Sequence, residues 1–188
     1  MKNFKVCFSN NFQGSTTERF IKRNNNNLSS LILNVGGGCL GSPVRAGYGG
    51  VLRNDADFYL SGFSGYIHGS SDIMFVELYA IYKGFLLAKD LNFIDLICYS
   101  DSLHCVNFIP GPSMKFHVYA VLIQEINELL VQVNVIVCHT LRDGNQCADF
   151  MVKLGTSSNI EFLLHASPPD DQRHLLKIDV VGTFFYKD

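Results

Sequence analysis

Acidic side chains that follow or line apolar segments are the residues of this sequence with the clearest potential for chemistry. Asp101 comes directly after the short apolar run 96–100, which is how a buried strand presents a carboxylate at its carboxyl end. Asp101, or Ser100 before it, can also simply cap the next helix, and for one isolated acid that explanation is favoured. The presence of Glu77 upstream and of a polar block from His139 to Asp149 downstream strengthens the first interpretation.

Glu77 lies within the apolar stripe of a predicted helix that begins with Ser71 as its N-cap and ends near Asp90. The stripe has helical spacing and contains Ile73, Val76, Ala80, Ile81, Gly84, Leu87 and Ala88. An unpaired buried charge is costly, so the glutamate either sits at the edge of the stripe and reaches water or faces a site. Its position alone favours neither alternative.

The block from His139 to Asp149 follows a strand rich in β-branched residues and leads into the last predicted helix. That helix begins near Asn145. Asn145 and Asp149 are four residues apart, so they share one face of the helix. The block therefore adds a histidine, an amide and a carboxylate to the candidate site.

The composition is that of one folded domain. The chain has 188 residues, 47% of them hydrophobic and 17% charged, and its formal net charge of -2 gives no sign of nucleic-acid binding. Six cysteines occur without a Cys-x-x-Cys pair, so we expect buried free thiols in a reducing compartment. We find no secretory signal and no run of membrane-spanning length, and therefore expect a soluble, intracellular protein with no membrane partner.

Three segments are expected along the chain: a flexible polar leader over 1–30, a folded domain over 31–155, and a tail over 156–188 that packs on or near the domain. The predicted elements are strands at 31–35, 45–53 and 58–66, a helix at 71–90, a strand at 96–100, helices at 101–109 and 115–131, a strand at 133–138 and a helix from about 145. We expect three glycines, Gly36–Gly38, to end the first strand.

The order of these elements predicts an α/β fold with a mixed five-stranded sheet flanked by helices. The first three strands form an antiparallel meander, and the last two follow helical crossovers and run parallel to the first. In such sheets the working groups gather at the carboxyl ends of the parallel strands. Those ends are at Gly36, Asp101 and His139 in this sequence.

Several segments, taken in order, resemble the type 1 ribonuclease H domains of plant retroelements and of plant proteins derived from them. They are Leu33–Arg53, Glu77–Ile81, Ser100–Ser102, His139–Asp149, Pro168-Pro169 and Val180–Phe185. The resemblance covers about residues 31–188 and implies a ribonuclease H-like fold.

The resemblance implies a hydrolase that cuts the RNA strand of an RNA–DNA hybrid endonucleolytically, with two Mg²⁺ ions held by four carboxylates. It makes Glu77, Asp101 and Asp149 three of the four metal ligands and assigns water positioning or product release to His139. Asn145 would lie near the site and contact the nucleic-acid backbone. The family further implies a nucleic-acid partner and a monomeric domain.

Two further residues, Ser42 and Arg45, are candidates for backbone contact. In the family, the loop before the second strand meets the minor groove of the hybrid, where ribose hydroxyls mark the RNA strand.

The sequence departs from the family at the fourth ligand. The family has an aspartate at the end of the first strand, where this chain has Gly36, and glycine has no side chain to bind a metal. Asn34 is the nearest stand-in, but its amide is neutral and one pleat away. Phe75-Val76 also replaces the usual His-Ala before Glu77. Both departures are what we expect of a retroelement copy that accumulates mutations because selection on its activity is relaxed.

Three hypotheses follow. The chain is a working hybrid-directed ribonuclease, a nucleic-acid binder with the same fold that does not cut, or an interaction domain that binds no nucleic acid. Because three acids leave one side of the metal cluster open, we expect cleavage to be weak or absent. The net charge of -2 is compatible with the third hypothesis, an interaction domain that binds no nucleic acid.

Overall fold

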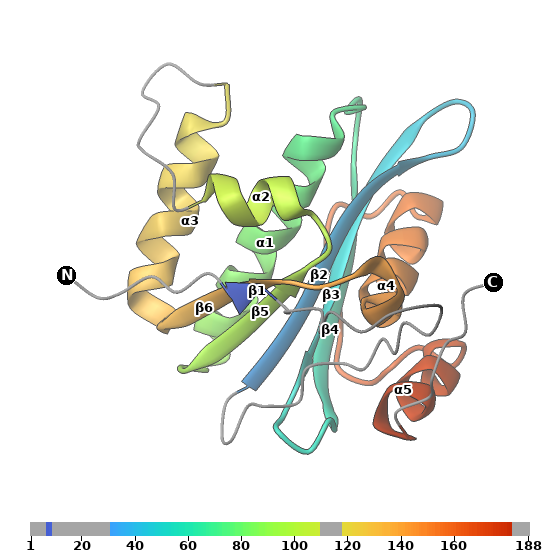
Figure 1. The fold of residues 1–188 in the computed structure, drawn as a ribbon. Helices are drawn as coiled ribbons and strands as arrows, with labels where there is room; N and C mark the ends of the chain where they lie inside the picture. Colours follow the sequence, from blue (N-terminus) through green and yellow to red (C-terminus); the bar gives the residue numbers. More distant parts are fainter. Residues whose placement is uncertain (1–6, 9–30, 110–117, 182–188) are drawn as a thin grey trace, which may run out of the picture.

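The computed structural model describes residues 7–8, 31–109 and 118–181, and places seven strands in one sheet (Figure 1). The strands are β1 (Cys7–Phe8), β2 (Leu31–Leu40), β3 (Arg45–Arg53), β4 (Tyr59–Ile67), β5 (Leu96–Ser100), β6 (Val135–His139) and β7 (Leu163–His165). The helices are α1 (Ile73–Asp90), α2 (Leu103–Phe108), α3 (Ala120–Val133), the 3₁₀ turn η1 (Arg142–Gly144), α4 (Gln146–Ser157) and α5 (Gln172–Val181).

The centre of the sheet confirms the predicted fold class. The strand order is β1-β6-β5-β2-β3-β4-β7; β2, β3 and β4 form the antiparallel meander, and β5 and β6 run parallel to β2. The five predicted strands are thus present, and two short edge strands are added. β7 pairs with β4, and β1 pairs with β6, although β1 lies inside the segment expected to be a flexible leader. The rest of residues 1–30 lies outside the described residues.

The three glycines do not end the first strand, contrary to the prediction. β2 continues through Gly36–Gly38 to Leu40 and pairs with β3 along its whole length. The glycines let helices approach the sheet: a Cβ on Gly37 would lie 2.6 Å from the backbone carbonyl carbon of Val76 in α1. The strand therefore extends past the level of the candidate site, and the β2–β3 turn projects from the body of the fold (Figure 1).

The helix starts differ from the predicted ones in a way that bears on the acids. Asp72, not Ser71, caps α1 by accepting a hydrogen bond from the Phe75 amide. Ser102, not Ser100 or Asp101, caps α2 by accepting from the Cys105 amide. Asp101 therefore does not cap α2, and helix capping does not explain an acid at this position. α3 begins at Ala120 rather than 115, and residues 115–117 lie outside the described residues.

Helices cover both faces of the sheet (Figure 1). α1, α2 and α3 pack on one face in a core cluster that includes Leu33, Val35, Ile81, Phe85, Cys105, Ile126 and Val137. α4 packs on β2, β3 and β4 from the other face, with Val51, Cys147 and Met151 between them. α1 carries Glu77 and α4 carries Asp149, so these two acids approach β2 from opposite faces of the sheet.

The C-terminal segment packs against this domain. The Gln172 side chain, fully buried, donates a hydrogen bond to the Cys147 carbonyl oxygen at 3.0 Å. Leu175 and Leu176 of α5 pack against the α4 cluster. The predicted apolar patch at 180–185 lies largely outside the described residues.

Among the described cysteines, Cys98, Cys105, Cys138 and Cys147 are buried free thiols, whereas Cys39 is a free thiol that is only partly buried. Within the described part of the chain, the helices are too short or too polar to cross a membrane.

Candidate active site

The register of three neighbouring strands places part of the predicted site at one end of the sheet, where the parallel strands have their carboxyl ends. Val35 of β2, Ser100 of β5 and His139 of β6 lie at the same level in the parallel ladder. The next residues along β2 and after β5, Gly36 and Asp101, therefore lie side by side at this end. His139 is half-buried at the end of β6, as predicted; its role in water positioning or product release stays a prediction.

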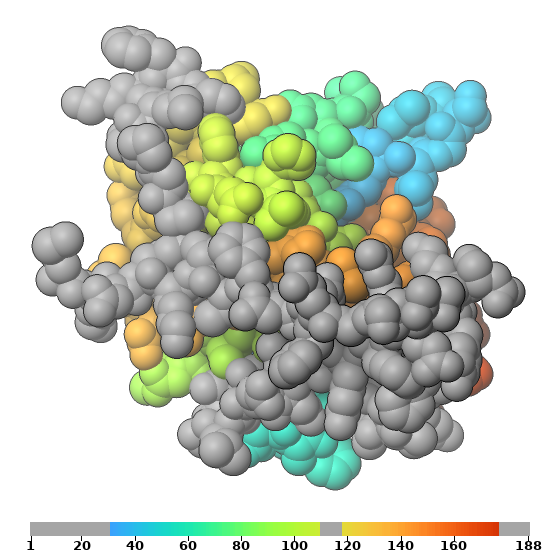
Figure 2. Space-filling model, in the orientation of Figure 1, coloured from blue at the N-terminus to red at the C-terminus, as the bar shows by residue number. Residues whose placement is uncertain are grey.

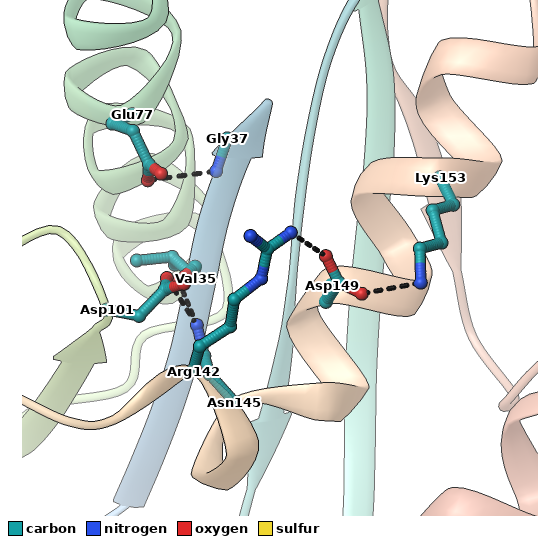
Figure 3. A network of polar contacts seen from close by, with 8 residues as sticks. All are labelled: Val35, Gly37, Glu77, Asp101, Arg142, Asn145, Asp149 and Lys153. Atoms are coloured by element: carbon teal, nitrogen blue, oxygen red, sulfur yellow. Dashed lines mark hydrogen bonds and ion pairs between the residues drawn. The ribbon is translucent and has the colours of Figure 1, made fainter. Parts of the chain in front are cut away.

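Glu77 faces the site rather than the solvent. Its Oε2 atom accepts a hydrogen bond from the Gly37 backbone N–H at 2.9 Å (Figure 3). Burial and, to a smaller extent, the nearby charge of Asp101 raise the pKa of Glu77 to about 8, while the Gly37 N–H and the charge of Arg142 oppose the shift. Glu77 is thus close enough to Asp101 for their charges to interact.

A buried amide holds Asp101 in place. The Nδ2 atom of Asn145 donates hydrogen bonds to the Asp101 Oδ1 atom at 3.0 Å and to the Val35 carbonyl oxygen at 2.9 Å. Asn145 is only 2% exposed, and it lies at the start of α4, so one side chain ties α4, β2 and the end of β5 together. The structure thus gives Asn145 a positioning role that was not predicted; backbone contact by this residue stays a proposal.

Behind Asn145 lies a second polar layer that sequence reasoning missed. The Asn34 Nδ2 atom donates to the Asn145 Oδ1 atom at 3.1 Å, and the Asn34 Oδ1 atom accepts from the Arg53 Nη2 atom at 2.9 Å. Arg53 and Asn34 are each 1% exposed. Because the Asn34 amide is committed to these two partners, the stand-in role considered for it does not fit the structure. Polar residues inside two apolar strands were the available signal.

The Cβ direction of Gly36 points into this site. A Cβ built at this residue would lie 3.8 Å from the Asp101 Oδ1 atom, 3.7 Å from the Asn145 Nδ2 atom and 3.5 Å from the Val152 Cγ2 atom. These are ordinary contact distances, so the backbone has room for a side chain here. A side chain at position 36 would therefore lie in the site, beside Asp101 and Asn145.

Asp149 lies on α4, and its carboxylate forms ion pairs with two cations. Its Oδ2 atom is 2.7 Å from the Lys153 Nζ atom, and its Oδ1 atom is 3.4 Å from the Arg142 Nη2 atom (Figure 3). Lys153 is one helical turn further along α4, a spacing that sequence reasoning could have used. Among the described residues, no three His, Cys, Asp or Glu side chains are grouped closely enough to hold a metal ion.

The two residues predicted to contact nucleic acid near the β2–β3 turn have different surroundings. Ser42 is exposed, and the end of the β2–β3 hairpin that carries it projects from the surface as the light-blue atoms of the space-filling view (Figure 2). The Arg45 guanidinium donates to the Thr156 carbonyl oxygen at 2.6 Å, to the Asn159 side chain at 2.9 Å and to the Ser158 carbonyl oxygen. Arg45 thus anchors the end of α4 to β3, and the proposed contact with nucleic acid would require it to leave these partners.

Residues 34–155 match the sequence model of the reverse transcriptase-like family. The chain belongs to this family. The match spans the predicted domain from β2 to α4 and includes each of the candidate site residues. No curated protein sequence matches the chain.

Solved structures similar to this reverse transcriptase-like domain are ribonuclease H domains. The N-terminal RNase H domain of rv2228c from Mycobacterium tuberculosis has a TM-score of 0.61 and 22% identity, covering 69% of this chain and 95% of that one. LC11-RNase H1, isolated from compost and solved with an RNA/DNA hybrid, has a TM-score of 0.61 and 21% identity, covering 68% and 97%. RNase H1 from Halobacterium salinarum has a TM-score of 0.58 and 20% identity, covering 68% and 98%. The predicted ribonuclease H-like fold is confirmed.

The donor set of this reverse transcriptase-like domain does not fit two Mg²⁺ ions. Mg²⁺ prefers a near-octahedral set of oxygen ligands, and a two-ion site needs acids on both sides of the pair. Here Glu77 and Asp101 lie together, Gly36 contributes no oxygen, and both oxygens of Asp149 are paired with cations.

Proposed function

We propose that this chain is a nucleic-acid-binding domain of the ribonuclease H fold that recognises RNA–DNA hybrids and cleaves them weakly or not at all. The observation that carries the proposal is Gly36, whose Cβ direction points at Asp101 within an otherwise recognisable site. The fold and the family support the binding partner. Structures of LC11-RNase H1 and of a foamy viral protease-reverse transcriptase, both of similar fold, contain RNA/DNA hybrids.

The loss of cleavage follows from charge and geometry. In the ribonuclease H mechanism that the resemblance implies, carboxylates concentrate divalent cations beside the phosphate that is attacked. This chain has no carboxylate at position 36, and its Asp149 carboxylate is paired with Arg142 and Lys153. The site therefore offers cations far less negative charge than four ionised acids would, and we propose that it binds Mg²⁺ poorly.

We further propose that the domain derives from a plant retroelement and acts as a monomer. The departures at Gly36 and at Phe75-Val76 occur beside a hydrogen-bonded site that is otherwise well ordered. This pattern is what relaxed selection on cleavage, with retained selection on folding, would leave.

The experiment compares the parent chain with Gly36→Asp on a labelled RNA–DNA hybrid in the presence of Mg²⁺. Gly38→Asp is a matched control, because Gly38 is on the same strand face and the added charge is the same. We expect slow or undetectable cleavage by the parent and by Gly38→Asp, and a rate at least about 100-fold higher for Gly36→Asp.

Robust Mg²⁺-dependent cleavage by the parent, equal to that of Gly36→Asp, would contradict the proposed defect. If neither protein bound the hybrid, the chain would instead be an interaction domain of the same fold.

A further inference from the structure

Two cations at the edge of the candidate site are held by the protein's own carboxylate. Arg142 lies in η1, and its side chain points toward Asp149; Lys153 approaches the same carboxylate from the next turn of α4 (Figure 3). Each oxygen of the Asp149 carboxylate is therefore paired with a different cation. Neither cation belongs to the ligand set or to the nucleic-acid contacts inferred from the sequence.

The geometry leaves both cations available to a larger ligand. The side chains of Arg142 and Lys153 are 73% and 62% exposed, whereas that of Asp149 is 27% exposed. An exposed ion pair of this kind contributes little free energy, because water competes for both partners. An external anion can therefore replace the Asp149 carboxylate with little loss of stability.

The charges around this point repel an anion less than a cluster of four acids would. Glu77, Asp101 and Asp149 carry at most three negative charges, and Arg142 and Lys153 carry two positive ones. An acid at position 36 would add a further negative charge within contact distance of Asp101, and this chain lacks it. An approaching phosphate thus meets two cations without the full repulsion of a four-acid cluster.

We propose that Arg142, with Lys153 beside it, binds a backbone phosphate of the nucleic acid without any divalent ion, and that Asp149 occupies this phosphate position in the free domain. The inference rests on the proposed function, because the ligand is the phosphodiester backbone of the bound hybrid. The planar guanidinium of arginine matches phosphate oxygens as well as it matches a carboxylate. Asp149 thereby acts as an internal competitor of the nucleic acid.

The first test measures hybrid affinity in EDTA over a series of salt concentrations for the parent, Arg142→Ala and Arg173→Ala. Arg173 is a matched control: it is 61% exposed and pairs with Asp170 at 3.3 Å on α5, so its loss changes the net charge equally. We expect Arg142→Ala to weaken binding about 10-fold at low salt and to reduce the slope of log affinity against log salt by about 1. Arg173→Ala should bind as the parent does.

The second test is Asp149→Asn, which removes the internal competitor and keeps the shape of the side chain. We expect hybrid affinity in EDTA to rise by roughly 2- to 10-fold, because Arg142 and Lys153 no longer have a carboxylate partner. An unchanged or lower affinity of Asp149→Asn in EDTA would overturn the proposal, because an acid that only binds metal should not affect the affinity there.

A DNA duplex of the same sequence serves as a second probe, because phosphate contacts carry no sequence information. Arg142→Ala should weaken binding of hybrid and duplex by the same factor, and a loss confined to the hybrid would overturn the phosphate assignment. Equal affinities of Arg142→Ala and Arg173→Ala, with the parent still binding the hybrid, would overturn this inference alone. Absence of hybrid binding by the parent would overturn both this inference and the proposed function.

Discussion

The Glu77–Asp101 side of the candidate site is buried and supported by uncharged hydrogen-bond donors, whereas the Asp149 side is partly exposed and held by two cations. On the first side, a backbone N–H and the Asn145 amide donate to the acids. On the second side, Arg142 and Lys153 neutralise the carboxylate directly. The two sides belong to the same end of one sheet, with the Cβ direction of Gly36 pointing between them toward Asp101.

The two sides differ in what surrounds their acids. On the buried side, burial and the charge of Asp101 raise the pKa of Glu77, and the charge of Arg142 offsets only part of this shift. On the exposed side, Arg142 and Lys153 pair directly with the Asp149 carboxylate. We infer that the exposed side has the chemistry of a phosphate contact.

The largest effect on stability is expected from Asn145→Ala on the buried side. The change removes the donor of Asp101 and of the Val35 carbonyl oxygen and the acceptor of the Asn34 amide. Leaving these buried groups without a partner should lower the free energy of unfolding by about 2–4 kcal/mol, measured by urea denaturation. Asn159→Ala is the control, because that side chain is exposed; an equal loss in both variants would contradict the structural role of Asn145.

A pH-dependent effect is expected at Glu77, whose pKa rises on folding from 4.5 to about 8. Between these values the folded protein keeps a proton that the unfolded chain has lost. The free energy of unfolding should therefore fall as the pH rises through this window and stay low above it. Glu77→Gln removes this loss, so the variant should be more stable than the parent at pH 9 by up to a few kcal/mol and similar to it near pH 4.

Thermal unfolding between pH 4 and pH 9 provides the measurement. The control is Glu128→Gln, because Glu128 is exposed on α3 and accepts a hydrogen bond only from Gln124 among the contacts described for it. Parallel curves for the parent and Glu77→Gln over the whole range would show that Glu77 is not buried beside Asp101.

The smallest effect is expected from Lys153→Ala on the exposed side. Because the Lys153–Asp149 pair is a solvent-exposed pair at i,i+4 spacing, its loss should change the free energy of unfolding by about 0.5 kcal/mol or less. High salt should abolish even this difference. A loss above about 1.5 kcal/mol in urea denaturation would mean that the two sides do not differ as described.

The sequence predicted the helices and strands that carry the site better than the hydrogen bonds between its buried side chains. The position of Asp101 after an apolar run and the helical stripe around Glu77 placed both residues correctly, because strand and helix periodicity are local signals. The polar layer of Asn34, Arg53 and Asn145 joins residues up to 111 positions apart, and no local pattern indicates such partners.

The glycines at 36–38 show a second limit. Glycine clusters usually mark turns, and the prediction ended the strand there. In the structure a residue without a side chain is required at Gly37 by the close approach of α1, a tertiary constraint that the sequence does not display. The edge strands β1 and β7 were missed for a related reason, since each is short and is stabilised by its neighbour in the sheet.

The most direct test of the central claim, that the acids as they stand do not fit a metal pair, is a titration of the folded parent and of Gly36→Asp with Mn²⁺, with free Mn²⁺ followed by electron paramagnetic resonance. We expect weak, unsaturated binding by the parent and clearly tighter, saturable binding by Gly36→Asp, because the added carboxylate enters the site beside Asp101. Saturable binding of two ions by the parent, as tight as in the variant, would contradict the account.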